Sequence, residues 1–352
     1  MRDVAVIAFA QTPGVRCEPS RVDVEMVAPV ILEAFQQCGM DRKEIGFTVS
    51  GSTDFLSGLP FSFAHALDAA APWPPIPESH VEMDGAWALY EAWVKLQMGE
   101  VDTALIYSFG KSSTPDDLVD VMAMQMDPYS IVPLGADTIG LAALQAQALL
   151  DKGRCTERDF AEIAIRNRRS GMDNPFAQLQ GEFDVDTLLR EPYIASPLRR
   201  HACPPITDGA CAMIIASAEV AGNYCERPAW IRGIDHRIDA HQPGLRDLTV
   251  SPSTTLATEM AGVHRDKLDV VELYAPFAHQ ELILREAMGL QDSANVNPSG
   301  GAMASNPIMS AGLIRGGEVA QRIWQGAGDR GVAHATSGSC LQQNLVTVLE
   351  GS

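Results

Sequence analysis

Three absences limit what this sequence can encode. It contains no uninterrupted apolar run approaching ~20 residues, the length that a membrane-spanning helix needs. It also lacks an excess of basic residues, because 26 Lys and Arg stand against 45 Asp and Glu and give a net charge of −19. Binding to the phosphates of a nucleic acid, or to an anionic membrane surface, needs a basic surface. We therefore expect neither a nucleic acid nor a membrane as a partner.

Cysteine does not occur in the patterns that hold metals or disulfides. The seven cysteines are odd in number, scattered along the chain, and include no C-x-x-C pair. This spacing offers no zinc cage and no disulfide framework, and it is typical of a reducing compartment. The N-terminal apolar stretch is short, carries an early Asp3 and lacks the small-residue cleavage site of a secretory signal. We therefore expect a cytoplasmic protein without a metal site.

The order of apolar segments predicts an α/β protein. The chain has 352 residues, enough for two or three domains, and 46% of them are apolar, as in a globular protein. Short apolar strands alternate with segments of helical periodicity, and Gly39 and Gly99 end the two helices. The strands are 4–9, 45–50 and 104–107, and the helices are 22–38 and 86–98. This alternation indicates a mostly parallel sheet covered by helices.

The second half of the chain repeats the first. Residues 38–49 align without a gap with residues 261–272, at an offset of about 225 residues. Helix 86–98 and the strand after it have a counterpart at the same offset, in a helix at 309–325 and a strand at 331–336. Two matches at one offset favour an internal duplication.

A segment without strand alternation interrupts the first half. It is rich in helix and loop, with one helix near 139–150, and residues 211–216 then resume a core strand. We therefore predict four parts of the chain. They are an N-terminal half at 1–110, an inserted loop domain at 111–201, the last elements of the N-terminal half at 202–225, and a C-terminal half at 226–352.

Several motifs, in this order, resemble the thiolase superfamily. They are Arg-Asn-Arg at 166–168, Asn-Pro-Phe at 174–176, Cys-Pro-Pro-Ile-Thr-Asp-Gly-Ala at 203–210, Val-Glu-Leu-Tyr-Ala-Pro-Phe at 271–277, and Asn-Pro-Ser-Gly-Gly at 297–301 before a glycine-rich helix. They span nearly the whole chain, and the likeness is greatest to the branch around the sterol carrier protein thiolases. The resemblance implies a thiolase fold, with a duplicated five-layered αβαβα core and a helical loop-domain insertion. It also implies a dimer, with an identical or a homologous thiolase-like chain.

The nucleophile of that family is missing. A thiolase carries a reactive cysteine at the N-terminus of the buried first-half helix, where the helix dipole lowers the thiol pKa. The matching position is Met83, or Asp84 in a register shifted by one residue, and neither is a thiol. Claisen chemistry through an acyl-cysteine is therefore not expected. Asp84 is either the N-cap of helix 86–98 or a catalytic group, and Met83 is a candidate substrate-binding residue.

Two further family positions are changed or left open. Asn306 stands where the family has a histidine in a G-H-P turn, and it is either a turn residue or a hydrogen-bond donor to an oxyanion. Cys340 is the candidate for the second family cysteine, as the base or as a buried structural cysteine. His334 is expected in the final strand, with substrate binding as the alternative.

Tyr274 replaces the Asn or His that the family places beside the reacting carbonyl, and the family's neighbouring acid is Ala275. A phenol there can give or take a proton, although a tyrosine at a strand end is often a core residue. Family members that lack the thiol resemble the aldol lyases of steroid side-chain breakdown. Those enzymes cleave a 3-hydroxyacyl-CoA in the retro-aldol direction with tyrosines and work with a small OB-fold and zinc-ribbon partner.

The resemblance therefore implies an aldol lyase with acyl-CoA as substrate and no other cofactor. Tyr274 is the candidate base, while Asn306 and backbone N–H groups of the turns at Gly300 and Gly301 are candidates to hold the enolate. Arg166 and Arg168, with Arg169, are candidates for the CoA phosphates, and surface ion pairs are the alternative. The competing hypothesis is a non-catalytic thiolase-like subunit that completes the site of an active homologue or partner.

Overall fold

The computed structural model describes residues 2–58, 60–70, 76–114, 118–290, 293 and 295–351. The first half contains β1 (Val4–Gln11), α1 (Asp23–Cys38), β2 (Phe47–Gly51), α2 (Asp54–Ser57), α3 (Ser62–Ala70), β3 (Glu78–Val81), α4 (Gly85–Gln97), β4 (Thr103–Lys111), β7 (Asp208–Ser217) and α9 (Ala218–Ala221). Between β4 and β7 lie α5 (Leu118–Ala123), α6 (Thr138–Asp151), α7 (Glu157–Ser170), α8 (Val185–Leu188), β5 (Tyr193–Ala195) and β6 (Leu198–Arg199). The second half contains β8 (Ala229–Ile238), α10 (Pro252–Ala261), β9 (Val270–Leu273), α11 (Ala278–Ala287), α12 (Gly301–Ala304), α13 (Ala311–Trp324), β10 (Arg330–Ser337) and β11 (Gln343–Glu350).

The two halves have the same strand order, which confirms the predicted duplication. The first half orders its strands β3-β2-β4-β7-β1, and the second orders them β9-β10-β11-β8. Strand β2 is parallel to both β3 and β4, and β9 is parallel to β10, whereas the other neighbouring pairs are antiparallel. The expectation of a mostly parallel sheet was therefore wrong, because the last strands of each half reverse direction. A single bridge between Val271 and Val296 takes the place of β3 in the second half. The halves join through a short pairing of β1 with β8.

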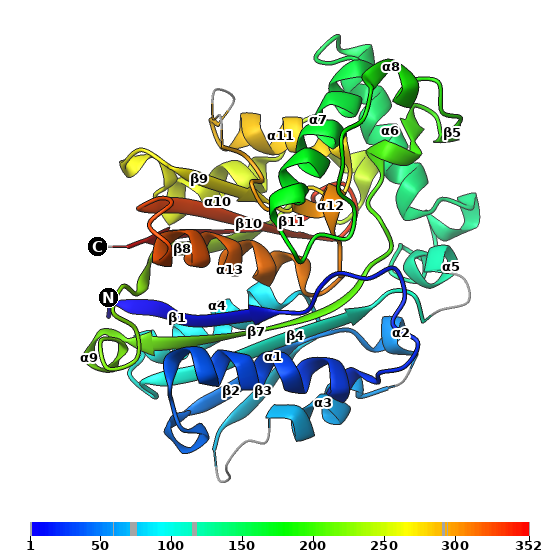
Figure 1. The fold of residues 1–352 in the computed structure, drawn as a ribbon. Coiled ribbons are helices and arrows are strands. Elements are labelled where there is room, and N and C mark those ends of the chain that lie inside the picture. The colour runs from blue at the N-terminus through cyan, green and yellow to red at the C-terminus, as the bar shows by residue number, and fades with distance from the viewer. Residues whose placement is uncertain are drawn as a thin grey trace.

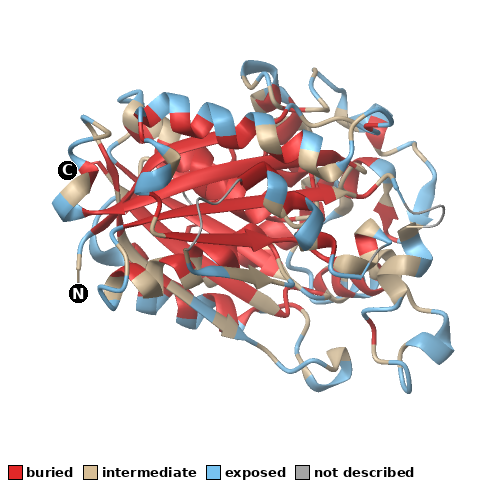
Figure 2. Ribbon diagram, turned by 90° about the horizontal axis from the view of Figure 1, so that it is seen from below, coloured by how far each residue is buried: buried red, intermediate tan, exposed pale blue. Residues whose placement is uncertain are grey.

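Helices and sheets form five layers (Figure 1). Helices α4 and α13 lie between the two half-sheets, where Leu89 and Leu313 belong to a core shared with Ile106 of β4 and Leu345 of β11. Helices α1 and α3 cover the outer face of the first half-sheet, and α10 and α11 cover that of the second. Figure 2 shows the buried residues concentrated in the strands, with exposed residues on the outer helices and loops. The predicted αβαβα arrangement is therefore confirmed.

The inserted segment is largely helical, as predicted, and adds the short hairpin β5–β6. The periodicity did not reveal β3, β8 or β11. The expected place of His334 in the final strand was wrong. His334 lies in β10, and β11 is the final strand. The boundaries of the four predicted parts stay a prediction. No helix in the described part of the chain is long and apolar enough to cross a bilayer.

Candidate active site

A cavity of about 480 Å³ lies where the two halves meet the inserted segment. Its wall is mainly apolar and is built by α5, the start of α6, residues 203–206, the residues after β9, and the turns at 306–309 and 336–341. The polar and ionisable residues in this lining are Asp84, Ser112, Gln125, Asp137, Thr138, Cys203, Tyr274, Gln280, Asn306, Thr336, Ser337, Ser339 and Cys340. An apolar cavity with a few polar groups is the usual form of a small-molecule site.

The carboxylate of Asp84 caps the N-termini of two helices. It is the N-cap of α4, and its Oδ1 accepts hydrogen bonds from Ala86 N–H at 2.9 Å and from Leu313 N–H at 3.0 Å. Its Oδ2 accepts a hydrogen bond from Gly312 N–H at 2.8 Å, so the starts of α4 and α13 share one carboxylate. Burial raises its pKa to about 6, although the three N–H groups oppose the shift. The predicted capping role is therefore present in the structure, and the same residue lines the cavity.

The start of α13 approaches Asp84 so closely that only glycine fits. A β-carbon on Gly312 would lie 2.5 Å from Asp84 Oδ1 and 2.6 Å from the β-carbon of Ala335. The close approach explains why the sequence has a glycine-rich stretch at this point.

Tyr274 follows β9 and lines the cavity. Its backbone N–H donates to the carbonyl of His334, and its ring packs with Ala302 and Ala311. Its hydroxyl has no hydrogen-bond partner among the described residues. Burial, and then the nearby charge of Asp84, hold the pKa of Tyr274 far above the ordinary value of a phenol. Tyr274 is therefore a neutral hydrogen-bond donor at physiological pH.

Asn306 lies in the cavity wall on the turn before α13. Its backbone N–H donates to Thr207 Oγ1 at 3.0 Å, which fixes the turn against the strand β7. Its side-chain Oδ1 is buried without a hydrogen-bond partner in the described part of the chain. Because buried polar groups are normally paired, this amide oxygen is available to accept a hydrogen bond from a bound molecule. Only the Nδ2 of the same amide can donate one.

The two cysteines in the lining are unreactive. Burial raises the pKa of Cys340 to about 11 and that of Cys203 to about 12. Cys340 also directs its thiol to the carbonyl of Leu141 at 3.4 Å. Since the thiolate is the nucleophile and the stronger base, neither residue serves in that form near neutral pH. These surroundings favour the structural alternative for Cys340.

Seven candidate residues named from the sequence lie outside the cavity lining. They are Met83, Arg166, Arg168, Arg169, Gly300, Gly301 and His334. Met83 packs against the core between the half-sheets. His334 is buried in β10, where burial lowers its pKa to about 4 and its Nε2 lies 3.0 Å from Asn344 Oδ1.

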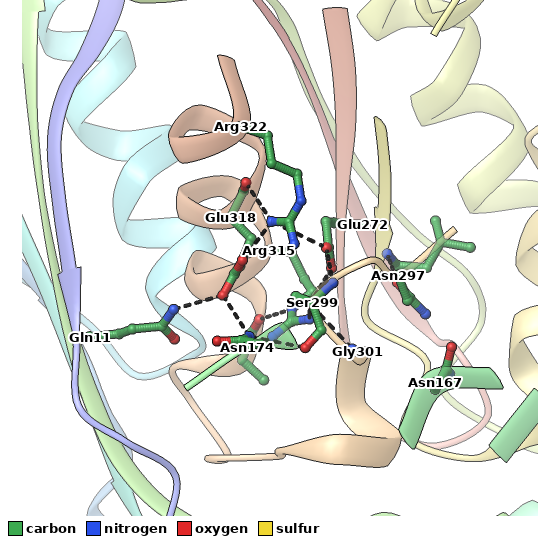
Figure 3. A network of polar contacts seen from close by, with 12 residues as sticks. Gln11, Asn167, Asn174, Glu272, Asn297, Ser299, Gly301, Arg315, Glu318 and Arg322 are labelled. Atoms are coloured by element: carbon green, nitrogen blue, oxygen red, sulfur yellow. Dashed lines mark hydrogen bonds and ion pairs between the residues drawn. The ribbon is translucent and has the colours of Figure 1, made fainter. Parts of the chain in front are cut away.

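The turn at residues 297–301 faces a buried charge network instead of the cavity (Figure 3). Glu272 accepts hydrogen bonds from Ser299 N–H at 2.9 Å and Ser299 Oγ at 2.7 Å, and it pairs with Arg315 at 3.0 Å. Gly300 N–H donates to the carbonyl of Asn297, and Gly301 N–H donates to Ser299 Oγ. The backbone donors expected to hold an enolate are thus already used within the turn.

The arginines of the inserted segment make protein contacts. Arg166 pairs with the buried carboxylate of Glu281, its Nη2 lying 2.5 Å from a carboxylate oxygen. Arg168 is buried with its guanidinium over the ring of Phe183, 5.3 Å from the ring centroid. Arg169 pairs with Glu182 at the surface. The contacts of Arg166 and Arg169 favour the ion-pair alternative over phosphate binding, whereas Arg168 is buried against an aromatic ring.

Sequence analysis missed Ser112 and Thr138. Both line the cavity, and both have a buried hydroxyl without a hydrogen-bond partner among the described residues. No spacing or motif marks either residue, because Ser112 only follows a strand and Thr138 only begins a helix.

No family model matches the chain. It is 26% identical to an acetyl-CoA acetyltransferase of Methanothermobacter thermautotrophicus, over 94% of this chain and 92% of that relative. It is 30% identical to the benzoylsuccinyl-CoA thiolase subunit BbsB of Thauera aromatica, over 44% of this chain and 42% of that one. It is 25% identical to sterol carrier protein 2 of Bos taurus, over 74% of this chain and 54% of that protein.

Two solved structures share the fold. Human mitochondrial 3-ketoacyl-CoA thiolase in complex with CoA has a TM-score of 0.81 at 15% identity, over 100% of this chain and 98% of that one. The Ltp2-ChsH2(DUF35) aldolase has a TM-score of 0.81 at 17% identity, over 99% of this chain and 98% of that one. The protein therefore has the thiolase fold, and its sequence is similar to those of thiolase-related proteins along nearly its whole length.

Proposed function

We propose that this protein is an aldol lyase that cleaves a carbon–carbon bond of a 3-hydroxyacyl-CoA, with a steroid side chain as the acyl group. One observation carries the proposal: an ionisable carboxylate (Asp84), a neutral phenol (Tyr274) and an amide whose Nδ2 can donate (Asn306) line one apolar cavity, in which the cysteines keep their protons. Relatives named for acetyl-CoA and benzoylsuccinyl-CoA support the acyl-CoA, and an aldolase of the same fold supports the reaction type.

Asp84 is the proposed base, in place of Tyr274. Retro-aldol cleavage needs a group that takes the proton of the 3-hydroxyl, and a base works best when its pKa lies near the operating pH. With a pKa of about 6, Asp84 is largely ionised at neutral pH. A phenol whose pKa is raised far above its ordinary value stays protonated, so it can donate a hydrogen bond but cannot act as the base.

Tyr274 and Asn306 are the proposed donors to the thioester oxygen. When Asp84 takes the hydroxyl proton, the O–H electrons form the new carbonyl and the bond between C2 and C3 breaks. The electron pair of that bond moves toward the thioester and forms an enolate. The enolate oxygen accepts hydrogen bonds from the Tyr274 hydroxyl and the Asn306 amide N–H. Return of the proton from Asp84 to C2 gives the shortened acyl-CoA beside an aldehyde or ketone.

Thiolase chemistry is disfavoured by the same geometry. Helix N-termini lower a thiol pKa when their N–H groups are free to bind the thiolate. Here Asp84 accepts hydrogen bonds from the N–H groups of Ala86, Gly312 and Leu313. Cys203 and Cys340 lie in the apolar wall and keep their protons.

Products formed by the purified protein test the proposal. The purified protein, alone and together with any OB-fold and zinc-ribbon protein that co-purifies with it, is incubated with a panel of 3-hydroxyacyl-CoAs and the mixture is analysed by mass spectrometry. We expect an aldehyde or ketone and an acyl-CoA shortened accordingly. Background levels of both products, from folded protein that binds CoA thioesters, would refute the proposed reaction.

A second candidate function is a non-catalytic subunit that completes the site of an active homologue. It is favoured because the N–H groups of Gly301, Gly312 and Leu313 already donate within the protein, and thioester oxygens are often held by such donors. Co-purification with a second thiolase-like chain that supplies the turnover would support it. Turnover by the isolated homodimer would exclude it.

A further inference from the structure

Two residues of the cavity lining carry hydroxyls that have no part in the proposed reaction. Ser112 Oγ and Thr138 Oγ1 are buried without a hydrogen-bond partner among the described residues, and both residues line the cavity that holds Asp84 and Tyr274. Ser112 is 1% exposed. Because native proteins rarely leave buried polar atoms unpaired, such atoms in a cavity wall indicate a polar group on the molecule that fills it.

Hydrogen bonds of neighbouring residues hold the backbone beside both Ser112 and Thr138. Ser112 directly follows β4, and the next residue, Ser113, donates through its N–H at 2.9 Å and its Oγ at 2.5 Å to the buried carboxylate of Asp208. Thr138 is the first residue of α6, where the N-cap Asp137 accepts a hydrogen bond from Gly140 N–H. Their positions are therefore set before a ligand binds, as in a preorganised recognition site.

The charge of the cavity limits which polar group can bind there. Its described lining contains Asp84 and Asp137 and no lysine, arginine or histidine. Helix N-termini attract anions, but those of α4 and α13 are occupied by Asp84 and that of α6 by Asp137. A carboxylate brought in by a ligand would meet the carboxyl groups of Asp84 and Asp137 and no cationic side chain in the described lining.

We propose that Ser112 and Thr138 bind an uncharged oxygen on the acyl chain, a hydroxyl or a ketone away from the thioester, and that the cavity rejects chains ending in a carboxylate. This selectivity rests on the proposed acyl-CoA function. A protein hydroxyl can donate to a ketone and accept from a hydroxyl, so both oxygens satisfy it. A plain hydrocarbon chain leaves both hydroxyls unpaired. Enzyme pockets reject a ligand that lacks a needed hydrogen-bonding group more strongly than one that differs only by a methylene group.

Binding, measured apart from turnover, tests this selectivity. The probes are dodecanoyl-CoA, its hydroxy and oxo derivatives substituted at successive positions from C5 to C12, and dodecanedioyl-CoA, none of which carries the 3-hydroxyl needed for cleavage. Isothermal titration of the full-length protein should give one or more oxygenated chains a Kd about 10-fold or more below that of the plain chain. The terminal carboxylate should bind more weakly than the plain chain.

Variants assign the preference to the two hydroxyls. The double variant Ser112→Ala, Thr138→Val should lose it and keep the affinity for dodecanoyl-CoA, whereas Thr138→Ser, which retains a hydroxyl, should preserve it. Ser130→Ala removes an exposed hydroxyl outside the cavity and is the matched control. Equal affinities for oxygenated and plain chains, a preference that survives the double variant, or tightest binding of the dicarboxylate would overturn the inference. Binding with this pattern but no cleavage would leave it standing and refute only the reaction; no binding by any probe would overturn both.

Discussion

At the scale of single residues, burial sets the chemistry of the site. Asp84 and Tyr274 lie in the same cavity, and burial is the largest cause of the raised pKa of both groups. Burial brings the pKa of the Asp84 carboxyl closer to neutral pH and moves the pKa of the Tyr274 phenol farther from it. One group therefore becomes able to exchange a proton, and the other becomes a fixed donor.

The pH dependence of turnover reports on Asp84. Because the protonated carboxyl cannot take the hydroxyl proton, kcat/KM should fall as the pH drops below about 6, with the slope of a single proton. Asp84→Asn should lower kcat/KM ~100-fold or more and remove this limb from the profile. Asp186→Asn, which changes a surface carboxylate, should keep the limb. A limb that persists in Asp84→Asn would assign the proton transfer to another group.

Tyr274→Phe removes a hydroxyl that has no hydrogen-bond partner among the described residues. Turnover should fall ~100-fold, because one donor to the developing oxyanion is lost. The free energy of unfolding should change by less than ~0.5 kcal/mol in urea titration, since no hydrogen bond within the described residues is broken. Tyr129→Phe, at a tyrosine that is 90% exposed, is the matched control and should leave both quantities unchanged. Unchanged turnover in Tyr274→Phe would remove this residue from the mechanism.

At the scale of elements, the glycine-rich helix α13 is explained by its neighbours. It lies between the half-sheets, with Gly312 against Asp84 and Gly317 against the ring of Phe9. Glycine lowers intrinsic helix stability by ~1 kcal/mol relative to alanine, so such a helix depends on close packing. Packing this close brings the N–H groups at the start of α13 onto the carboxylate of Asp84.

A β-carbon on Gly317 should therefore destabilise the protein in spite of its better helix propensity. It would lie 2.3 Å from ring carbons of Phe9. We expect Gly317→Ala to lower the free energy of unfolding by ~1–3 kcal/mol, as overpacking of a core does. Gly222→Ala, where a β-carbon meets nothing within 4 Å, should be nearly neutral. Equal effects of the two substitutions in urea unfolding would contradict the packing argument.

At the scale of the whole molecule, one buried network joins all three parts of the chain (Figure 3). Glu272 of β9 pairs with Arg315 of α13, and Glu318 of the same helix accepts hydrogen bonds from Gln11 at 2.7 Å and Asn174 at 3.1 Å. Gln11 ends β1 and Asn174 belongs to the inserted segment. The network thus connects the first half, the insertion and the second half.

Neutralising Glu272 should be costly, because Arg315 would remain buried without its partner. We expect Glu272→Gln to lower the free energy of unfolding by ~3–5 kcal/mol. The surface pair of Lys95 and Glu100 provides the control, and Glu100→Gln should change stability by less than ~1 kcal/mol. A small effect at Glu272, measured by thermal and urea unfolding, would mean that the network contributes little to holding the parts together.

Much of the fold could be predicted because its signals are local. Apolar periodicity predicted β1, α1, α4 and β10, and the glycines at their ends marked where the helices stop. Strands β3 and β8 escaped because β3 is a short edge strand and β8 alternates with polar residues that the apolar pattern does not mark. Family resemblance then supplied the order of the layers.

The sequence by itself determined the duplicated α/β fold and the absence of a cysteine at the start of α4, since both depend on residue types and their order along the chain. Only the tertiary structure decided which residues share a cavity. It placed Asp84, Tyr274, Asn306 and Cys340 in one cavity lining and added Ser112 and Thr138 to it. It placed the turn at 297–301 against the buried charge network instead. The physical reason is that pKa, hydrogen-bond availability and burial depend on neighbours from distant parts of the chain, as Asp84 does on Gly312 and Leu313.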